Sequence, residues 1–452
     1  MSQKQLSLTE GSIWKSMLLF ALPVFLGNLF QQFYNTFDSW CVGNFISDEA
    51  LAAVSSSGSL IFLIVSFFNG VAMGAGVVIA RYFGAKDYES MQKAIYTSIA
   101  LGLVVGVALS ILGVAFTPTI LRWMGTPAEV LPESISYFRW YFCGGIFIVM
   151  YNIFVGIHHA VGDSKNPLYY LIVSTLVNVV LDMVLVTTVW KSVAAAAFAT
   201  TVSQGISALL CYRNLIKVNE PYRVDPKRIR FDKESLFEII RYGVPSGVQN
   251  SVIALANVFV QSNINSFGKS AMAGCGSYSR LEGFAFLPVT CFTQALSTFV
   301  GQNLGARKHD RVKRGVGFGI ACSCIMAEVV GILSFLFAPQ LIGLFTDSAE
   351  AIAFGAKHMQ TIAPFYFLLA FSHCVAGIMR GAGKPSVPMF TMLACWCLIR
   401  VSYITIALKF VNELTTVSWA YPLTWTLSST IFLICLLKSD WIHNFDRTDA
   451  KV

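Results

Sequence analysis

The sequence predicts an all-α integral membrane protein in which twelve transmembrane helices form two pseudo-symmetric lobes of six helices each. Three observations support this fold class. Of 452 residues, 55% are hydrophobic and only 12% are charged, whereas a soluble domain carries about 25% charged residues. A series of apolar runs is long enough to cross a bilayer. An internal repeat, finally, aligns the second half of the chain with the first.

The apolar runs follow one another along the chain, and each is about 20 residues or longer, enough for a hydrocarbon core of about 30 Å. The first six cover roughly 14–40, 51–80, 92–116, 132–156, 167–189 and 193–214. Six more cover roughly 236–265, 271–299, 314–338, 356–379, 386–408 and 417–437. An even number of spans places both termini on the same side of the membrane.

Basic residues indicate which side holds the termini. We place 24 of the 32 Lys and Arg residues on that face, and 3 lie within spans. Only 5 fall in the opposite loops: Arg122, Lys191, Lys269, Lys357 and Lys409. Loops on the inner face carry the excess of Lys and Arg, so we expect a multi-pass protein of the plasma (inner) membrane with both termini cytoplasmic. The net charge of +8 comes from these loops and does not indicate a nucleic-acid partner.

The internal repeat has a nearly constant spacing. At an offset of 221 residues Gly162 aligns with Gly383, and at 222 Pro23 aligns with Pro245. Because each repeat has an even number of spans, both insert the same way round, which predicts a parallel pair with a cavity between the lobes. A loop with two prolines and mixed charge separates the halves. The predicted domains are a cytoplasmic N-terminus (1–12), an N-lobe (13–215), a cytoplasmic linker (216–235), a C-lobe (236–438) and a cytoplasmic tail (439–452).

Polar side chains follow one face of the first span. Spaced by three, four and three residues, they are Asn28, Gln31, Asn35 and Asp38. A stripe that ends in a carboxylate is costly in hydrocarbon, so it must face protein, water or an ion. We interpret Asp38 as part of a cation or proton site, and the amides as lining a substrate cleft.

Other segments of the first half bring oxygen atoms to the depth of Asp38. Asn178 and Asp182 share one face of span five. Asp182, Thr200 of span six and Tyr137 of span four each lie about eight or nine residues from a predicted outer turn, as Asp38 does. Two carboxylates with amide and hydroxyl oxygens suit a shared proton or a hard cation such as Na⁺. A structural network that holds the helices together is the alternative.

The second half differs from the first where this chemistry is expected. Val260 aligns with Asp38, and Tyr403 aligns with Asp182. Glu282, about twelve residues into span eight, is deep enough to face the cavity and attract organic cations; an ion pair with another helix is the alternative. Further candidates for the cleft, with helix packing as their alternative, are Asn250, Asn257, Gln261 and Arg280.

Pro23 predicts a kink in span one, because proline lacks an N–H and clashes with the preceding turn. A mobile kink would link ion binding to a change of shape and make Pro23 a hinge; a static kink is the alternative. The sequence has no Walker A motif, D-D-x-x-D motif or nucleophile elbow. We therefore expect no enzymatic activity, no cofactor and no metal beyond a possible Na⁺.

The order of several motifs resembles the MATE family, the multidrug and toxic compound extrusion transporters. The resemblance covers about 12–438 and rests on Pro23, Asp38, VGN at 42–44, RYFGAKD at 81–87, GDSKNP at 162–167, Asn178, Asp182 and GQNLGARKHD at 301–310. NorM-like members place acids in spans seven and ten. Here span seven has no acid after Glu238, and span ten carries His373, which favours the bacterial branch that resembles DinF and MepA.

The resemblance implies a fold of the MOP superfamily with a cleft that opens alternately to each side. It implies a functional monomer in the lipid bilayer that exports amphipathic, cationic drugs or toxic organic compounds in exchange for H⁺ or Na⁺. The implied coupling-ion ligands are Asp38, Asn178, Asp182 and Thr200, with Tyr137 and Asn152 as support. The alternative is a flippase or exporter of lipids or polysaccharide precursors, which we would expect to line its cleft with several cations for phosphate.

Overall fold

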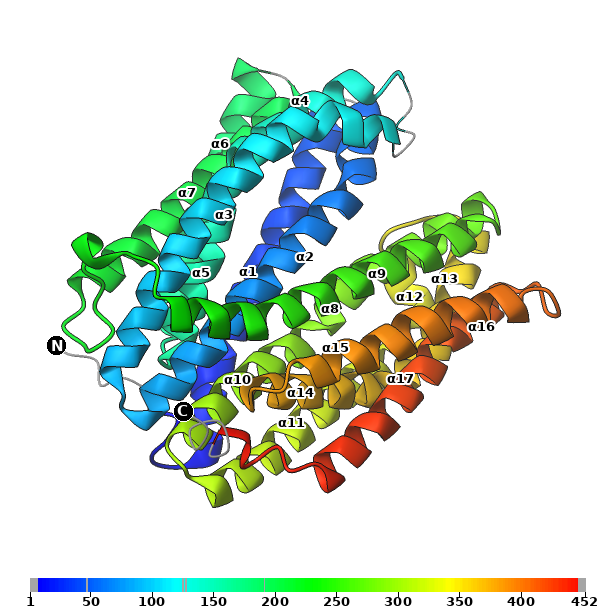
Figure 1. Ribbon diagram of the computed structural model, residues 1–452. Helices are drawn as coiled ribbons and strands as arrows, with labels where there is room; N and C mark the ends of the chain where they lie inside the picture. The colour runs from blue at the N-terminus through cyan, green and yellow to red at the C-terminus, as the bar shows by residue number, and fades with distance from the viewer. Residues whose placement is uncertain (1–6, 46–47, 124–125, 127, 191, 446–452) are drawn as a thin grey trace. The chain divides into compact units, whose positions relative to one another are not determined.

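The computed structural model describes residues 7–45, 48–123, 126, 128–190 and 192–445. All regular secondary structure in these ranges is helical (Figure 1). The first half contains α1 (Ile13–Phe45), α2 (Asp48–Ala85), α3 (Tyr88–Trp123), α4 (Leu131–Cys143), α5 (Gly145–Ala160), α6 (Lys165–Val184), η1 (Leu185–Val189), α7 (Val193–Lys217) and η2 (Pro226–Arg228). The second half contains α8 (Lys233–Asn265), α9 (Lys269–Ala285), α10 (Leu287–Gly305), α11 (His309–Leu336), α12 (Ala338–Gly343), α13 (Ala349–Ile362), η3 (Ala363–Phe365), α14 (Tyr366–Gly381), α15 (Ser386–Met392), η4 (Leu393–Ile399), α16 (Arg400–Ala407) and α17 (Leu414–Lys438).

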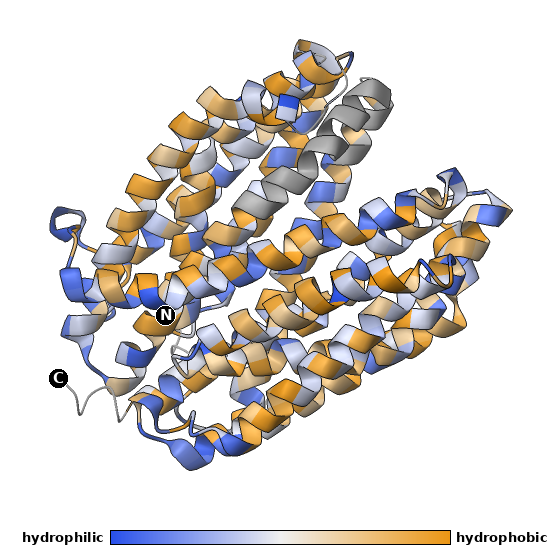
Figure 2. Ribbon diagram, turned by 45° about the vertical axis from the view of Figure 1, so that its right-hand side comes forward, coloured by the Kyte–Doolittle hydropathy of each residue, from blue (hydrophilic) through white to orange (hydrophobic). Residues whose placement is uncertain are grey.

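The all-α membrane fold is confirmed. Among the described residues, 10 helical segments are long and apolar enough to cross a membrane, or 11 when α4 and α5 count as one span bent by 46°. The remaining predicted span, 236–265, corresponds to α8, a 33-residue helix whose amide and hydroxyl side chains lower its hydropathy. Hydrophobic residues run along the helices, and hydrophilic residues gather toward the helix ends (Figure 2).

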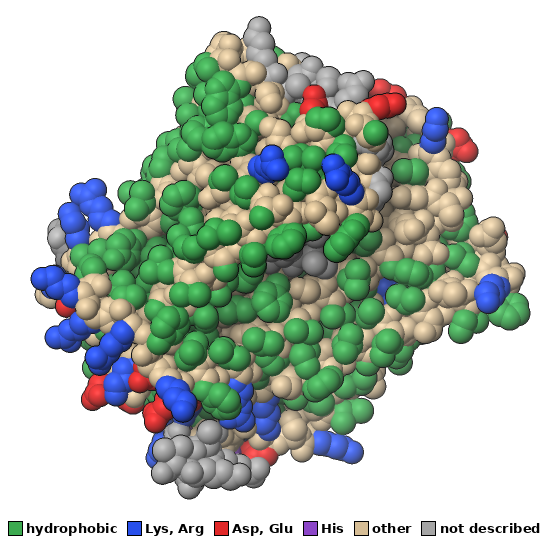
Figure 3. Space-filling model, turned by 45° about the horizontal axis from the view of Figure 1, so that its top comes forward, with side chains coloured by type: hydrophobic (Ala, Val, Ile, Leu, Met, Phe, Trp, Pro, Cys, Tyr) green, Lys and Arg blue, Asp and Glu red, His purple; other side chains and the backbone are tan. Residues whose placement is uncertain are grey.

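Hydrophobic side chains also cover much of the surface, as expected where a protein faces lipid. The face shown in Figure 3 is rich in them, and its charged side chains lie mostly around the margin of this face. On the outer side of α11, for example, Ile325, Val329 and Ile332 are all at least half exposed. The predicted outer turns near Ser47, Pro127 and Lys191 fall on residues outside the described ranges.

The chain folds into two compact units, and two helices are shared between them. Within the described ranges, unit 1 comprises residues 26–244, and unit 2 comprises 7–25 together with 245–445. The boundaries fall inside α1 and α8, next to Pro23 and Pro245. The first part of each of these helices therefore belongs to the opposite unit from the rest of it, whereas the lobes predicted from the sequence kept each helix whole.

The segment before α1 is anchored on unit 2. Leu8 is 1% exposed, and its carbonyl oxygen accepts a hydrogen bond from Asn303 Nδ2 at 3.1 Å. Arg311 donates to the carbonyl oxygens of Leu8, Glu10 and Gly11 at 3.2, 2.8 and 2.7 Å. Asn303 and Arg311 lie in or directly after the motif GQNLGARKHD, so this motif has a structural role in holding the start of the chain.

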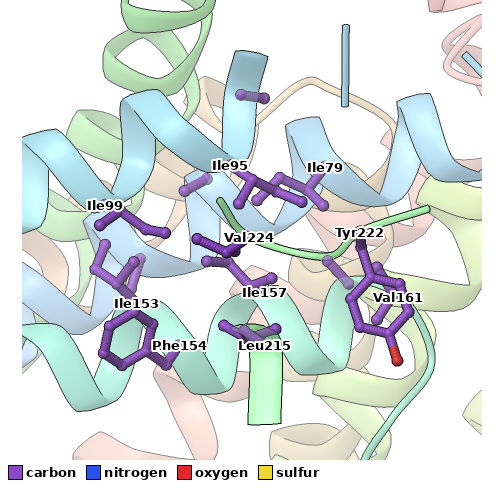
Figure 4. Close-up of a cluster of buried hydrophobic side chains, with 14 of the residues drawn as sticks. Ile79, Ile95, Ile99, Ile153, Phe154, Ile157, Val161, Leu215, Tyr222 and Val224 are labelled. Atoms are coloured by element: carbon purple, nitrogen blue, oxygen red, sulfur yellow. The ribbon is translucent and has the colours of Figure 1, made fainter. Parts of the chain in front are cut away.

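The linker between the halves is anchored on unit 1 in a corresponding way. Tyr222 and Val224 insert among the buried side chains of α2, α3, α5 and α7 (Figure 4). Gln92 Nε2 on α3 donates to the carbonyl oxygens of Pro221 and Arg223 at 2.8 and 3.2 Å. Although the linker has no apolar period in its sequence, its two buried side chains make it part of the core of unit 1.

The internal repeat is visible in the backbone. Among the described residues, only Lys86 and Arg307 have a positive φ without being glycine, at 59° and 54°, and they are 221 positions apart. Each follows a Gly-Ala pair that ends a helix, where a left-handed residue allows the next N–H groups to bond back to the last turn. Lys86 N–H, for example, donates to Phe83 O at 3.1 Å. The predicted repeat therefore extends to the geometry of single residues.

The turn in GDSKNP is held by Asp163. Its Oδ2 pairs with His158 Nδ1 at 3.0 Å and accepts from Asn166 Nδ2 at 2.7 Å. Burial works to raise the pKa of Asp163, but these hydrogen bonds outweigh burial and hold that pKa below its usual range. The carboxylate thus stabilises the turn at neutral pH, and this contribution is lost only as the pH falls through the lowered pKa.

Glycine allows α2 and α8 to cross closely within unit 1. A Cβ added at Gly74 would lie 2.3 Å from the Cα of Gly243, so the helices would have to separate. We expect Gly74→Ala to destabilise the protein by about 1–3 kcal/mol and to lower its thermal unfolding midpoint in detergent. The matched control is Gly317→Ala on α11, where the added Cβ meets nothing within 4 Å; there alanine should stabilise slightly. Equal midpoints for the two variants would contradict the close crossing.

Candidate functional site

The structure brings four of the predicted side chains together within unit 1. Asp38 lies on the part of α1 that belongs to this unit, Asn178 and Asp182 lie on α6, and Thr200 lies on α7. Asn178 and Asp182 are completely buried, and Thr200 is 5% exposed. Asp38 is half-buried. Three helices therefore bring two carboxyl groups, an amide and a hydroxyl together.

Hydrogen bonds connect these four groups. Thr200 Oγ1 donates to Asp38 Oδ2 at 3.2 Å. With its nitrogen turned toward the carboxyl groups, the Asn178 amide donates to Asp38 Oδ1 at 3.0 Å and to Asp182 Oδ2 at 3.3 Å. Asn178 thus bridges the two acids, and their carboxyl groups interact electrostatically with each other. The other oxygen of Asp182, Oδ1, is buried with no hydrogen-bond partner among the described residues.

This arrangement has a clear chemical consequence. Two carboxyl groups can share a hydrogen bond only when one of them holds a proton, and two carboxylates held close repel each other unless a proton or cation lies between them. A buried acceptor without a donor, such as Asp182 Oδ1, also costs free energy, because it has lost its hydrogen bonds to water. The location is therefore suited to bind one small positive charge.

Tyrosine side chains surround Asp38, and sequence reasoning found only one of them. Tyr137 stacks on Tyr141 with ring centroids 6.3 Å apart, and both interact electrostatically with Asp38. Tyr34 is 8% exposed and lies within hydrogen-bond reach of Thr200. The missed signal was spacing, because Tyr34 precedes Asp38 by four residues and Tyr141 follows Tyr137 by four, so each pair shares a helix face.

A π-helical segment follows Asp182 directly after α6. η1 (Leu185–Val189) begins three residues after Asp182. Inside it, Thr187 and Thr188 donate their hydroxyl groups to the carbonyl oxygens of Met183 and Val184. Such segments often occur at functional sites, and no feature of the sequence predicted this one.

Other predicted residues lie elsewhere. Asn152 Nδ2 donates to Ile148 O of its own helix at 2.8 Å, and no hydrogen bond among the described residues joins it to the acids. Of the amide stripe on α1, Asn28 is half-buried, and Gln31 and Asn35 are exposed. Pro23 is buried inside α1.

The predicted residues of the second half fall in unit 2. Asn257 Oδ1 accepts from Arg400 Nη1 at 3.5 Å, and Gln261 Nε2 donates to Asn265 Oδ1 at 2.9 Å. Asn250 is half-buried. Arg280 is exposed, with its guanidinium 5.9 Å from the ring centroid of Phe345.

Glu282 belongs to a polar centre of unit 2. Its Oε1 accepts a hydrogen bond from Tyr278 OH at 3.2 Å, and its charge interacts with that of Arg400. No ion pair within 4 Å joins Glu282 to Arg400 among the described residues. Glu282 is therefore part of a hydrogen-bonded network, and the charge of Arg400 offsets the attraction that it would have for a cation.

A repeated helical fold with polar side chains buried inside its spans is typical of a polytopic membrane transporter. The MatE family matches the chain twice, at residues 23–184 and 245–406. These matches begin at Pro23 and Pro245, which confirms the predicted repeat. The chain thus belongs to the MATE family of multidrug efflux transporters, whose members are not enzymes.

Individual relatives agree with this assignment. The probable multidrug resistance protein YoeA of Bacillus subtilis is 30% identical over 396 residues, which cover 86% of each chain. The multidrug export protein MepA of Staphylococcus aureus is 23% identical, with 85% of each chain covered. A MATE structure solved in the bent conformation matches with a TM-score of 0.90 at 23% identity and covers 100% of both chains.

The contact between the two acids predicts that their substitutions are not additive. We expect Asp38→Asn, Asp182→Asn and the double variant to give an interaction energy of about 1–3 kcal/mol in unfolding stability, because neutralising one carboxyl removes its repulsion of the other. The measurement is denaturant unfolding of the purified protein in detergent. The control cycle combines Asp38→Asn with Asp163→Asn, which has its own partners, and should be additive within about 0.5 kcal/mol. Additivity in both cycles would contradict the contact.

Proposed function

We propose that this protein is a secondary antiporter that exports amphipathic, cationic organic compounds in exchange for inward-moving H⁺ or Na⁺. The observation that supports this function best is the pair of half-buried Asp38 and completely buried Asp182, bridged by Asn178. A membrane helix rarely buries a carboxyl group without a function. Here two of them meet, and one has an unpaired oxygen.

In the proposed cycle, the coupling ion binds between the two acids and cancels one unit of negative charge. Without it, Asn178 turns its N–H groups toward both carboxylates. With Na⁺ bound, the amide would turn its oxygen to the cation and add one ligand to those of Asp38, Asp182 and Thr200. With a proton bound, the amide can keep its N–H groups turned toward the acids. The hydrogen bonds that join α1, α6 and α7 thereby depend on whether the two acids hold a proton, a sodium ion or neither.

The shared helices provide a path by which this change reaches the substrate. α1 carries Asp38 in unit 1 and continues past Pro23 into unit 2. Because proline removes one backbone hydrogen bond and bends a helix, we propose that Pro23 is the hinge at which α1 responds to ion binding. Alternating access would then follow from a difference in ion affinity between two shapes of the protein.

We further propose that the protein works as a monomer in the plasma (inner) membrane with both termini cytoplasmic. The basic loops support this orientation. Arg311 and the linker residues that anchor the ends of the two halves lie on the face with the excess of Lys and Arg.

The function is tested by neutralising one acid. We expect Asp182→Asn to abolish ion-driven efflux of a cationic dye, because the amide cannot hold a proton or supply a charged ligand. Efflux is measured in proteoliposomes under an imposed pH gradient and, separately, an imposed sodium gradient; the gradient that drives the wild type identifies the coupling ion.

The matched control for this test is Asp225→Asn, which neutralises an aspartate with 48% side-chain exposure in the linker. This variant should transport like the wild type. Immunoblots of membrane fractions check that both variants reach the membrane. Full efflux by Asp182→Asn would refute the proposed coupling site.

A further inference from the structure

A cavity of about 650 Å³ lies in unit 2, where the chain passes from α16 into α17. It is formed by these two helices and by the loop that joins them at one end of the pair (Figure 1). Its walls are mostly apolar and include Ile406, Phe410, Val411 and Trp419. The volume is large enough for a sizeable organic group. Because the two coupling acids lie in unit 1, this cavity is not part of the site described above.

The cavity lies at the level of the membrane surface. α17 has 25 residues and is about 37 Å long, so its two ends lie near opposite faces of the bilayer. Tyr403 and Trp419 line the cavity about one helical turn from the ends of α16 and α17 that meet the loop. Tyr and Trp are enriched at this level, because their rings contact hydrocarbon while their polar groups reach the lipid headgroups.

The apolar walls of the cavity are open to the surroundings of the protein. Phe410 is 83% exposed, Ile406 is 56% exposed and Trp419 is 47% exposed. Neighbouring large apolar side chains that are exposed in this way mark an interaction surface. At the edge of a membrane, the molecules that surround such a surface are phospholipids.

The walls have a fixed shape. The N–H groups of Phe410 and Val411 both donate to Ala407 O, at 3.0 and 2.9 Å, and Thr416 Oγ1 donates to Val411 O at 3.0 Å. The ring of Trp419 packs against that of another aromatic residue, Phe365, with centroids 5.8 Å apart. A cavity that is formed in advance loses little conformational freedom when a ligand binds.

The lining of the cavity includes one carboxylate, that of Glu413, which the protein does not use. Glu413 directly precedes α17 in the N-cap position, but its side chain makes no capping hydrogen bond. The residue is exposed, and its carboxylate has no hydrogen bond or ion pair with any described residue. Because a carboxylate can only accept hydrogen bonds, Glu413 requires a donor from a ligand or from water.

A lysine in the same loop has the opposite charge. Lys409 is exposed and lies four residues before Glu413. Across the described ranges, no ion pair within 4 Å joins the two side chains. A ligand with one positive and one negative group can therefore contact both residues.

The headgroup of phosphatidylethanolamine has these two groups. Its primary ammonium carries N–H donors for a carboxylate, and its phosphate accepts from a lysine ammonium. A choline headgroup has the same charges but no N–H donor, and a glycerol headgroup has no positive charge. The combination of Glu413 and Lys409 therefore favours an amine headgroup over the other two.

We propose that this cavity binds one molecule of phosphatidylethanolamine from the surrounding bilayer. Its ammonium group contacts Glu413, its phosphate contacts Lys409, and an acyl chain lies against Ile406, Phe410 and Trp419. This inference goes beyond the proposed export of organic compounds, because the lipid is a bound ligand and not the exported substrate. The lipid ties the loop between α16 and α17 to the membrane surface.

The test measures the affinity of the purified full-length protein for the first bound lipid by native mass spectrometry. The lipids are dioleoyl phosphatidylethanolamine, phosphatidylcholine and phosphatidylglycerol, which have identical acyl chains. We expect the wild type to prefer the ethanolamine lipid about ten-fold, the effect of one charge-assisted hydrogen bond. Glu413→Gln should remove this preference and should not weaken binding of the glycerol lipid.

A second variant tests the phosphate contact. Lys409→Gln should weaken binding of all three lipids by the same factor, because each of them has a phosphate. The matched control is Asp347→Asn, which neutralises an exposed acid in the loop between α12 and α13 that does not line the cavity. This variant should bind all three lipids like the wild type.

Three results would overturn the proposal. They are equal affinities of the wild type for the three lipids, an unchanged preference in Glu413→Gln, and loss of the preference in Asp347→Asn. Displacement of the ethanolamine lipid by a transported cationic dye would also overturn it, because the cavity would then hold substrate. These measurements use no ion gradient, so their outcome does not depend on whether Asp182→Asn blocks efflux.

Discussion

The structure of unit 1 depends on one constraint: two carboxyl groups must lie together inside a helix bundle, and one of them, Asp182, is completely buried. Neither group could be buried alone at acceptable cost, because a charge inside a membrane bundle requires a partner or a proton. Asn178 supplies donors to both acids, and Thr200 supplies one to Asp38. Three helices must meet at one depth to satisfy these hydrogen bonds, so the packing of unit 1 and the proposed cation site depend on the same contacts.

The exchange of helix segments between the units follows a rule that applies to both repeats. Each repeat begins with a long helix whose first part belongs to the opposite unit, and each of these helices is preceded by a segment anchored on that opposite unit. Polar side chains that bond to backbone carbonyl oxygens hold both anchors, Arg311 in one case and Gln92 in the other. The start of each helix is thus held on one unit, and Pro23 and Pro245 lie next to the point where each helix passes into the other unit.

The features that could be predicted from the sequence are those that depend on the regular spacing of residues along the chain. Spacing along one helix placed Asn178 beside Asp182, and equal depth placed Asp38 and Thr200 near them. Composition predicted the fold class, and a constant offset predicted the repeat. The bend at Gly144 was not predictable, because it depends on a neighbour: a Cβ there would lie 2.5 Å from Thr201 Oγ1. The π-helical segments and the partners of Arg400 were missed for the same reason, since contacts between distant helices have no local pattern.

The two units show how one repeated scaffold holds opposite charges. At the position of Asp182 the second repeat has Tyr403, and one turn away it has Arg400, where the first repeat has Val179. A carboxylate needs hydrogen-bond donors, which Asn178 and Thr200 provide, whereas a guanidinium is stabilised by aromatic faces, which Trp396 and Tyr421 provide. The hydrogen-bond donors around Asp182 would not stabilise a guanidinium, and the aromatic rings around Arg400 would not stabilise a carboxylate. Exchanging Asp182 and Tyr403 alone would therefore not transfer the site, because the donors and the aromatic rings that stabilise each charge lie on other turns and other helices.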